Sequence, residues 1–226
     1  MFENVEPLSS TKHANLKIIP LNDYSFAKNI SRVPLSHAEL VQASRHFPIV
    51  FPTGENLLPQ ALLSLNQSKN SFVDENGNWT VPYVPAHIRR YPFILAQSDD
   101  QGNYAVCIDT DAPHLSYEQG NPLYTDNGEH TDLMNNAVEF LKTYHQEMQT
   151  TERLFSALQE RDLMQDKQFT IGSGDNQFTV RGFKTVDTEK LGELDDVTLG
   201  DWVKRGIMGL IYAHLHSLDN TRRLAV

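Results

Sequence analysis

Three turn sequences, each lying between two short apolar runs, most constrain the fold of this chain. Asparagine, aspartate and glycine dominate the turns, and these residues tolerate the positive φ angles of tight connections. Each such unit predicts a β-hairpin, so we expect antiparallel sheet. The paired runs are residues 71–73 and 79–81, 93–97 and 104–108, and 169–171 and 178–180, around turns at 76–77, 99–103 and 172–176.

The hairpins differ in their polarity patterns. Residues 93–97 and 104–108 are nearly continuous apolar runs, which favours a central place with both sheet faces covered. Residues 169–180 alternate between apolar and polar, so we expect that hairpin near an edge. Two further apolar runs, at 49–51 and 61–65, are too short for stable helices and are predicted as buried strands.

Helical periodicity dominates the second half of the sequence. Residues 131–164 contain no glycine or proline, and apolar residues recur there at helical spacing. We expect two helices in this stretch. Thr150 and Thr151 are the predicted break, because they are β-branched and able to cap a helix.

Two capping patterns predict further helices. Ser36 and Glu39 form an S-x-x-E capping box, which predicts a short helix ending near His46. Residues 198–201 form a second box with aspartate at its last position, which predicts a final helix to about Leu218.

These patterns indicate an α+β fold. We expect an antiparallel or mixed sheet, built from hairpins in the first half and packed with a helix-rich second half. Residues 1–226 are expected to form a single domain. The sequence leaves open two sub-lobes, a β-rich lobe over 1–128 and a helix-rich lobe with one hairpin over 129–226.

Composition excludes several classes of function. Lys plus Arg is 19 and Asp plus Glu is 29, so the formal net charge is −10 and a nucleic acid would be repelled. The single cysteine, Cys107, allows no intramolecular disulfide and is expected to be a buried, inert thiol. No stretch is apolar enough to span a membrane, and the first residues lack the features of a signal peptide. We therefore expect a cytoplasmic protein.

The segment YVPAHIRRYPF at residues 83–93 is the best candidate for a binding site. Pro85 can start a helical turn and Pro92 must end it, which holds two adjacent arginines in a short, rigid connector. A guanidinium suits a carboxylate or phosphate. Ion pairing of both arginines with surplus acids of the chain is the structural alternative. The candidate ligand-binding residues are Tyr83, His87, Arg89, Arg90 and Tyr91.

Two carboxylates follow the predicted strand at 104–108. Asp109 and Asp111, with His114 shortly after them, are weak candidates for divalent metal ligands. A solvated strand end with local side-chain-to-backbone bonding explains the same residues, and we favour it. His214 lies on an apolar helix face and is predicted to be a hydrogen-bonded core histidine rather than an iron ligand. The sequence carries none of the familiar nucleophile, phosphate or dinucleotide motifs, so it identifies no catalytic residue and no cofactor.

The chain resembles the SapC family of bacterial proteins. The resemblance rests on YVPAHIRRYPF, the strand YAVCID, the segment NPLYTDNGE before a helix, and AHLHSLDNTRRL. The family takes its name from genes near those of surface-layer proteins, and related genes lie near TonB-dependent receptors and flavin-dependent halogenases. The resemblance thus implies a protein partner from such a receptor or halogenase neighbourhood. It carries over no catalytic residues.

Two hypotheses of different class follow. The first is a cytoplasmic, non-catalytic binding or accessory protein, whose ligand is an anionic small molecule or peptide held by Arg89 and Arg90. The alternative is a metal-dependent enzyme that uses the carboxylates of Asp109 and Asp111.

Overall fold

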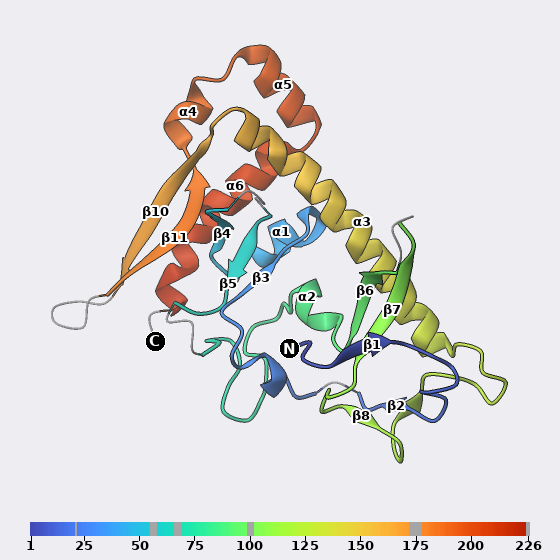
Figure 1. The fold of residues 1–226 in the computed structure, drawn as a ribbon. Helices are drawn as coiled ribbons and strands as arrows, with labels where there is room; N and C mark the ends of the chain where they lie inside the picture. Colours follow the sequence, from blue (N-terminus) through green and yellow to red (C-terminus); the bar gives the residue numbers. More distant parts are fainter. Residues whose placement is uncertain (21, 55–57, 66–68, 99–101, 172–177, 225–226) are drawn as a thin grey trace. The chain divides into compact units, whose positions relative to one another are not determined.

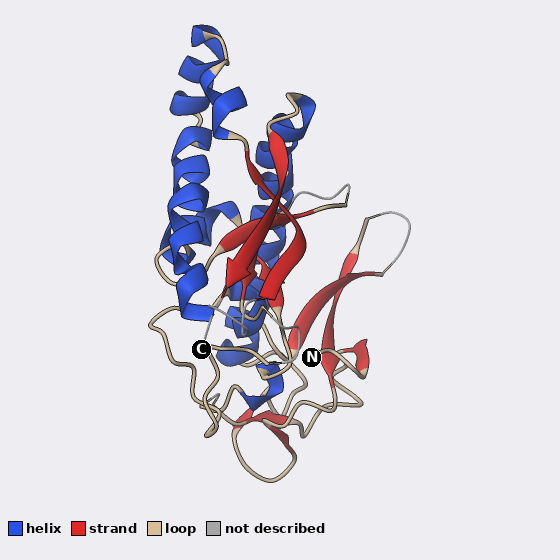
Figure 2. Ribbon diagram, turned by 90° about the vertical axis from the view of Figure 1, so that its left-hand side faces the viewer, coloured by secondary structure: helices blue, strands red, loops and turns tan. Residues whose placement is uncertain are grey.

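The structure is a computed structural model that describes residues 1–20, 22–54, 58–65, 69–98, 102–171 and 178–224 (Figure 1). The strands are β1 (Val5–Pro7), β2 (Lys17–Ile18), β3 (Arg32–Pro34), β4 (Ile49–Pro52), β5 (Gln60–Leu62), β6 (Phe93–Gln97), β7 (Tyr104–Asp109), β8 (Leu115–Ser116), β9 (Asn121–Pro122), β10 (Met164–Ile171) and β11 (Phe178–Val186). The α-helices are α1 (His37–Ala43), α2 (Ala86–Arg89), α3 (Asp132–Glu160), α4 (Thr188–Gly192), α5 (Asp196–Lys204) and α6 (Ile207–Ser217). Antiparallel sheets and helices together confirm the predicted α+β class (Figure 2).

The chain forms two compact units, each assembled from separate stretches of sequence. The first unit consists of Met1–Lys28, Val73–Thr80 and His87–Gln146. The second unit consists of Asn29–Phe72, Val81–Ala86 and Glu147–Val226. Helix α3 contributes its first part to the first unit and its remainder to the second. The single cooperative domain expected from the sequence stays a prediction.

The first unit contains a three-stranded sheet in the order β1-β7-β6. Strands β6 and β7 pair in antiparallel register with Phe93 opposite Ile108, which confirms the predicted hairpin. Only β7 is central, because β1 adds to it on the far side, so the predicted central place is wrong for β6. Phe93 and Ile108 pack in one core cluster with Met134 and Leu141 of α3. The sheet and the start of α3 therefore share a core.

The predicted hairpin around residues 76–77 is reduced to a turn. Gly77 has a φ of +82°, as expected, but the flanking runs meet only at the isolated bridge between Val73 and Trp79. The Asp74 carboxylate accepts the backbone N–H groups of Asn76 and Asn78 at 2.9 and 2.8 Å. These local bonds satisfy backbone groups within the loop, which explains why no longer ladder forms in this described segment.

The second unit contains a five-stranded sheet in the order β10-β11-β4-β5-β3. Each neighbouring pair is antiparallel. The hairpin of β10 and β11 confirms the prediction for 169–180, and β10 lies at the edge as expected. Its turn at 172–176 falls outside the described residues. The predicted strands at 49–51 and 61–65 are present as β4 and a shorter β5.

Helix α3 runs unbroken over 29 residues, so the predicted break at Thr150 and Thr151 is wrong. The Thr151 hydroxyl donates to the Glu147 carbonyl one turn earlier, at 2.6 Å. The same oxygen accepts the backbone N–H of His37 at 2.7 Å. Because this hydroxyl bonds along the helix and to a neighbouring segment, it does not compete with the helix.

Helix α1 begins after Ser36 as predicted, but the capping box does not form. The Ser36 hydroxyl donates instead to the Glu147 carboxylate at 2.9 Å. Glu39 accepts the backbone N–H of Ala86 at 3.1 Å, so its carboxylate serves a tertiary contact. Helix α1 ends at Ala43, and the residues from 44 to the predicted end near His46 form turns.

The predicted final helix is two helices, α5 and α6. Gly206 adopts a φ of +77° between them, a left-handed conformation that glycine tolerates and that interrupts the helix. The cap of α5 also lies earlier than predicted, because the Asp195 carboxylate accepts the Thr198 N–H at 2.9 Å. Val203, an apolar residue of α5 within the predicted helix, is 65% exposed.

His214 holds α6 to the sheet of the second unit. Its Nδ1 lies 2.8 Å from the Ile49 carbonyl of β4, and its Nε2 accepts the Val186 N–H of β11 at 3.2 Å. The side chain is fully buried, and burial lowers its pKa to about 4. Because Nε2 accepts, Nδ1 carries the proton, and the imidazole is neutral. The prediction of a hydrogen-bonded core histidine is confirmed.

Replacing His214 with leucine removes both bonds and leaves two buried backbone groups without a partner. We expect the free energy of unfolding to fall by about 2–4 kcal/mol. Urea titration followed by Trp202 emission in a Trp79→Phe background measures this in the second unit. His216→Leu, at an exposed position of the same helix, is the matched control and should change stability by less than about 0.5 kcal/mol. Equal effects of the two variants would contradict this role.

The depressed pKa of His214 also makes stability depend on pH. Between pH 6.5 and about 4 the unfolded state binds a proton at His214 that the folded state does not. Stability is therefore complete above pH 6.5 and declines as pH falls, by up to about 3 kcal/mol from this group. His214→Asn, which does not titrate, should show a correspondingly shallower decline by the same Trp202 measurement. Parallel curves for the two proteins would refute the assignment.

Candidate functional site

The first unit contains a half-open cavity of about 450 Å³. Its apolar lining comes from β2, β6 and the first turns of α3. These side chains include Ile18, Phe93, Leu133, Ala137, Phe140 and Leu141. Polar groups of the same lining come from Arg89, Arg90, Tyr91, His114, Asn121 and Asn136. A volume of this size with few polar groups fits a small-molecule site.

The proline-bounded connector places both arginines at this cavity. Helix α2 is one turn that follows Pro85, as predicted, and Pro92 comes shortly after it. Arg89 ends the helix, is exposed, and has its guanidinium carbon 5.1 Å from the Phe140 ring centroid. It therefore lies at the rim of the cavity.

Arg90 is held between two aromatic rings. Its guanidinium carbon lies 5.1 Å from the ring centroids of Phe2 and of Tyr144. Its Nε is buried and has no hydrogen-bond partner in the described part of the chain, where Arg90 also forms no ion pair. The alternative prediction, pairing with a surplus acid, is therefore wrong for Arg90 within those residues. Burial lowers the pKa of the guanidinium, but an arginine stays charged at neutral pH.

His87 and Tyr83, the other predicted ligand residues, do not line this cavity. His87 Nδ1 lies 3.2 Å from the Tyr144 hydroxyl, so it supports the ring that stacks on Arg90. Burial, with a smaller contribution from the Arg90 charge, lowers the pKa of His87 to about 3 and keeps it neutral. Tyr83 belongs to the second unit, where its hydroxyl donates to Glu39 at 3.3 Å.

His114 is the cavity residue whose role the sequence did not show. Its side chain is 6% exposed, and neither of its buried ring nitrogens makes a hydrogen bond of normal geometry among the described residues. The Tyr91 backbone interacts weakly with the ring and opposes the effect of burial on its pKa. The ring packs edge-on against Tyr91, with centroids 5.2 Å apart. Burial lowers the pKa of His114, so the imidazole is neutral at pH 7. Sequence reasoning considered it only as a metal ligand, because its apolar neighbours are distant in the chain.

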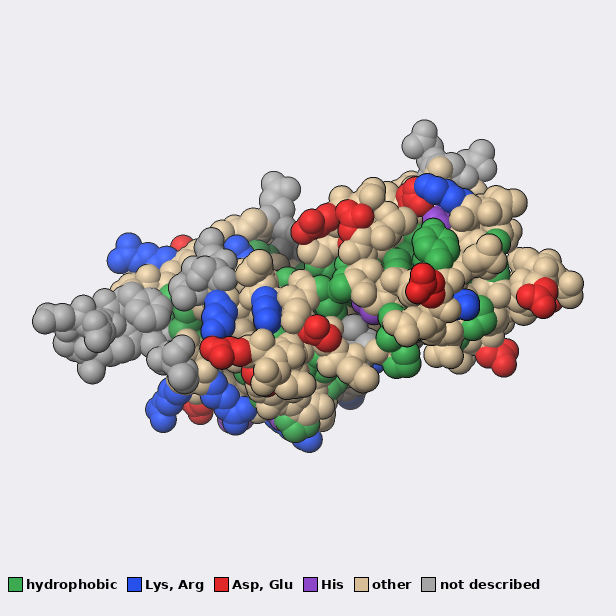
Figure 3. Space-filling view, turned by 90° about the horizontal axis from the view of Figure 1, so that it is seen from below, with side chains coloured by type: hydrophobic (Ala, Val, Ile, Leu, Met, Phe, Trp, Pro, Cys, Tyr) green, Lys and Arg blue, Asp and Glu red, His purple; other side chains and the backbone are tan. Residues whose placement is uncertain are grey.

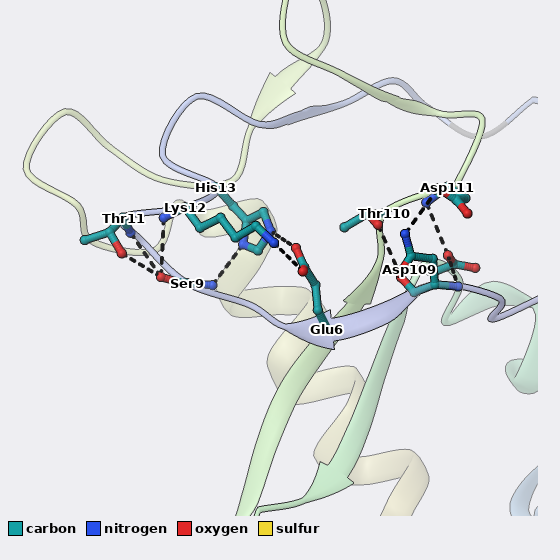
Figure 4. Close-up of polar contacts among 9 residues, drawn as sticks. Glu6, Ser9, Thr11, Lys12, His13, Asp109, Thr110 and Asp111 are labelled. Atoms are coloured by element: carbon teal, nitrogen blue, oxygen red, sulfur yellow. Dashed lines mark hydrogen bonds and ion pairs between the residues drawn. The ribbon is translucent and has the colours of Figure 1, made fainter.

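Asp109 acts as a structural acceptor at the end of β7 (Figure 4). It accepts backbone N–H groups from Glu3, Asn4 and Asp111 at 3.1, 3.1 and 3.2 Å. The Tyr91 hydroxyl donates a fourth bond at 3.1 Å. Burial alone would raise the pKa of Asp109, but these hydrogen bonds outweigh it and hold the pKa below its usual value. Local and tertiary bonding together thus occupy both carboxylate oxygens.

The candidate metal ligands are not assembled into a metal centre in the part of the chain that is described. Asp111 is exposed, and its carboxylate accepts a hydrogen bond from the Asn4 side-chain amide at 3.5 Å. No group of three or more His, Cys, Asp or Glu side chains among the described residues is placed to hold a metal ion. The metal-dependent alternative stays a prediction from the sequence.

A second polar cluster fixes the segment after β1 (Figure 4). The buried His13 accepts the Ser9 N–H at 3.0 Å through Nδ1, and its Nε2 lies 2.8 Å from the Glu6 carboxylate. Lys12 forms an ion pair with the same carboxylate. All three side chains are partnered, so the cluster serves to hold this segment in place.

Arg90 is distinguished by its aromatic surroundings. On the face shown in Figure 3, Lys and Arg side chains lie among Asp and Glu side chains, with hydrophobic side chains between them. That face is therefore not uniformly basic.

The fold and the cavity define an α+β protein with a cationic group set in an apolar site. A model of the SapC family matches residues 8–224, and the chain belongs to that family. Comparison with curated proteins and with solved structures gives no significant match. None of the helices in the described ranges is long and apolar enough to cross a membrane.

Replacing Asp109 with asparagine turns one acceptor oxygen into a donor that faces existing donors. We expect a loss of about 2–4 kcal/mol in the free energy of unfolding, measured by urea titration. Asp111→Asn is the control and should change stability by less than about 0.5 kcal/mol. If both variants were neutral, and a divalent ion stabilised the wild type but neither variant, the metal alternative would gain support instead.

Proposed function

We propose that this SapC-family protein is a binding or accessory protein whose first unit holds an anionic small molecule in the cavity. Arg90 takes the anionic group, and the apolar walls take the body of the ligand. The proposal rests on the guanidinium of Arg90. This group is largely buried, borders the cavity and has no ion-pair partner among the described residues.

Electrostatics favours a ligand at this position. A charge removed from water is unfavourable unless an opposite charge or hydrogen bonds replace the lost solvation. The rings of Phe2 and Tyr144 offset part of this cost through cation–π contact and fix the guanidinium plane. A carboxylate, sulfonate or phosphate would supply the missing charge in a low-dielectric setting, where its attraction is strong.

The apolar side chains that line the cavity favour an anion with an apolar body. Side chains such as Leu133, Phe140 and Leu141 offer no polar groups, so an apolar body is buried favourably against them. A volume of about 450 Å³ accommodates a small organic acid. A peptide would place only its terminal carboxylate and an adjoining apolar side chain there.

We also propose that the protein works together with a protein partner. A binding protein of this kind acts by passing its ligand to, or taking it from, another protein. The gene neighbourhood that the family resemblance implies makes a receptor or a halogenase the candidate partner. The cytoplasm is the proposed compartment, because the single cysteine requires no oxidising surroundings.

Two fluorescent probes with one apolar body test the role of Arg90. They are 1-anilinonaphthalene-8-sulfonate and its neutral counterpart, N-phenyl-1-naphthylamine. Arg90→Met keeps an apolar stem but removes the charge. It should weaken sulfonate binding by about tenfold or more and change binding of the neutral probe by less than about twofold. Fluorescence titration gives both dissociation constants, and circular dichroism confirms that the variant is folded.

Arg205→Met is the matched control, because Arg205 is an exposed arginine of the second unit. It should leave both dissociation constants unchanged. An equal loss of both probes in Arg90→Met would show that Arg90 matters for packing rather than for charge. Failure of the sulfonate probe to bind with a stoichiometry near one would contradict the proposed function.

A further inference from the structure

The cavity contains a second buried polar group whose partner is missing. Both nitrogens of the His114 imidazole are buried in a side chain that is only 6% exposed, and neither makes a hydrogen bond of normal geometry in the described residues. The Tyr91 backbone lies near enough to the ring to oppose the lowering of its pKa, and it leaves at least one nitrogen without a partner among those residues. Buried polar side-chain atoms are almost always hydrogen-bonded in folded proteins. His114 also borders the cavity that Arg90 borders. A ligand that fills the cavity can supply the missing bond.

The His114 imidazole packs against two aromatic rings that are themselves held in place. Its ring contacts Tyr91 at 5.2 Å and Phe26 at 6.1 Å between centroids. Tyr91 stacks on Phe26 at 4.4 Å, and its hydroxyl is tied to Asp109. The His114 ring is therefore positioned before any ligand arrives, which is the arrangement expected of a group that selects a ligand.

The chemistry of a neutral imidazole narrows the choice of ligand group. One ring nitrogen donates and the other accepts. A hydroxyl both donates and accepts, so it can pair with either nitrogen, whereas a carbonyl pairs only with the N–H. Burial lowers the pKa of His114 and favours the neutral imidazole, which acts through hydrogen bonds rather than charge. Arg90 remains the buried cation of the lining.

We infer that the cavity selects an apolar anion that carries a hydroxyl, with the anionic group at Arg90 and the hydroxyl at His114. This inference rests on the proposed function, since it assumes that the same cavity holds an anion through Arg90. His114 is then a specificity-determining residue of the site.

Decanoate and its hydroxylated derivatives test the inference. Displacement of 1-anilinonaphthalene-8-sulfonate gives dissociation constants for decanoate and for 2-, 3- and 10-hydroxydecanoate, which sample different separations of hydroxyl and carboxylate. At least one hydroxy acid should bind the wild type about tenfold more tightly than decanoate. In His114→Phe that preference should disappear, while the affinity for decanoate changes by less than about twofold.

A spectroscopic measurement covers the case in which His114→Phe does not fold. In the full-length wild type, the side-chain ¹⁵N signals of His114 should shift when the preferred hydroxy acid is added and stay in place with decanoate. His114→Gln, which keeps hydrogen-bonding groups without an imidazole, assigns those signals by their loss. Unchanged signals with every hydroxy acid would overturn the inference.

The two proposals fail in different ways. If decanoate binds through Arg90 but no hydroxy acid is preferred, the inference about His114 is wrong and the anion site stands. If neither decanoate nor the sulfonate probe depends on Arg90, the proposed function itself is wrong. In Arg90→Met all four acids should weaken together, and the hydroxyl preference should persist.

Discussion

The Asp109 carboxylate is the interaction on which the arrangement of the site depends. Three backbone N–H groups and the Tyr91 hydroxyl converge on it, and two of those N–H groups belong to Glu3 and Asn4. These bonds fix the segment that carries Phe2, whose ring lies over Arg90. The bond to Tyr91 fixes the ring against which His114 packs. The buried Asp109 carboxylate thus orients both the Phe2 ring that lies over Arg90 and the Tyr91 ring against which His114 packs.

Burial sets the character of the cavity. Arg90 is partly buried and His114 is buried, but the consequences differ, because one group keeps its charge and the other stays neutral. In the proposed function the charged group pairs with an anion, whereas the neutral group forms a hydrogen bond. Two polar groups with different requirements, set among apolar walls, impose an orientation on a ligand that apolar contact alone would leave free. This is the physical basis for reading the cavity as selective.

Sequence reasoning succeeded where the determinants are local. Turn chemistry predicted the hairpin of β6 and β7, and two prolines predicted the single turn of α2 that carries Arg89. It failed where local detail decides, as at the Asp74 bonds and the left-handed Gly206, and where a distant segment decides. Thr151 continues a helix because its hydroxyl meets His37, far away in sequence. Likewise His114 gave no local sign of its role, because the side chains that surround the cavity come from several separate segments.

Some residues of the site lie inside the span that the family model matches, and others lie outside it. Arg90, Tyr91, Asp109, His114 and Tyr144 all lie within the matched residues 8–224, whereas Phe2, Glu3 and Asn4 lie outside them. Glu3 and Asn4 reach Asp109 through backbone N–H groups, which any residue but proline supplies. The chemistry that requires particular side chains is therefore concentrated in the matched span, apart from the ring of Phe2. The proposed anion site at Arg90 and His114 therefore lies almost entirely within the part of the chain that the family model matches.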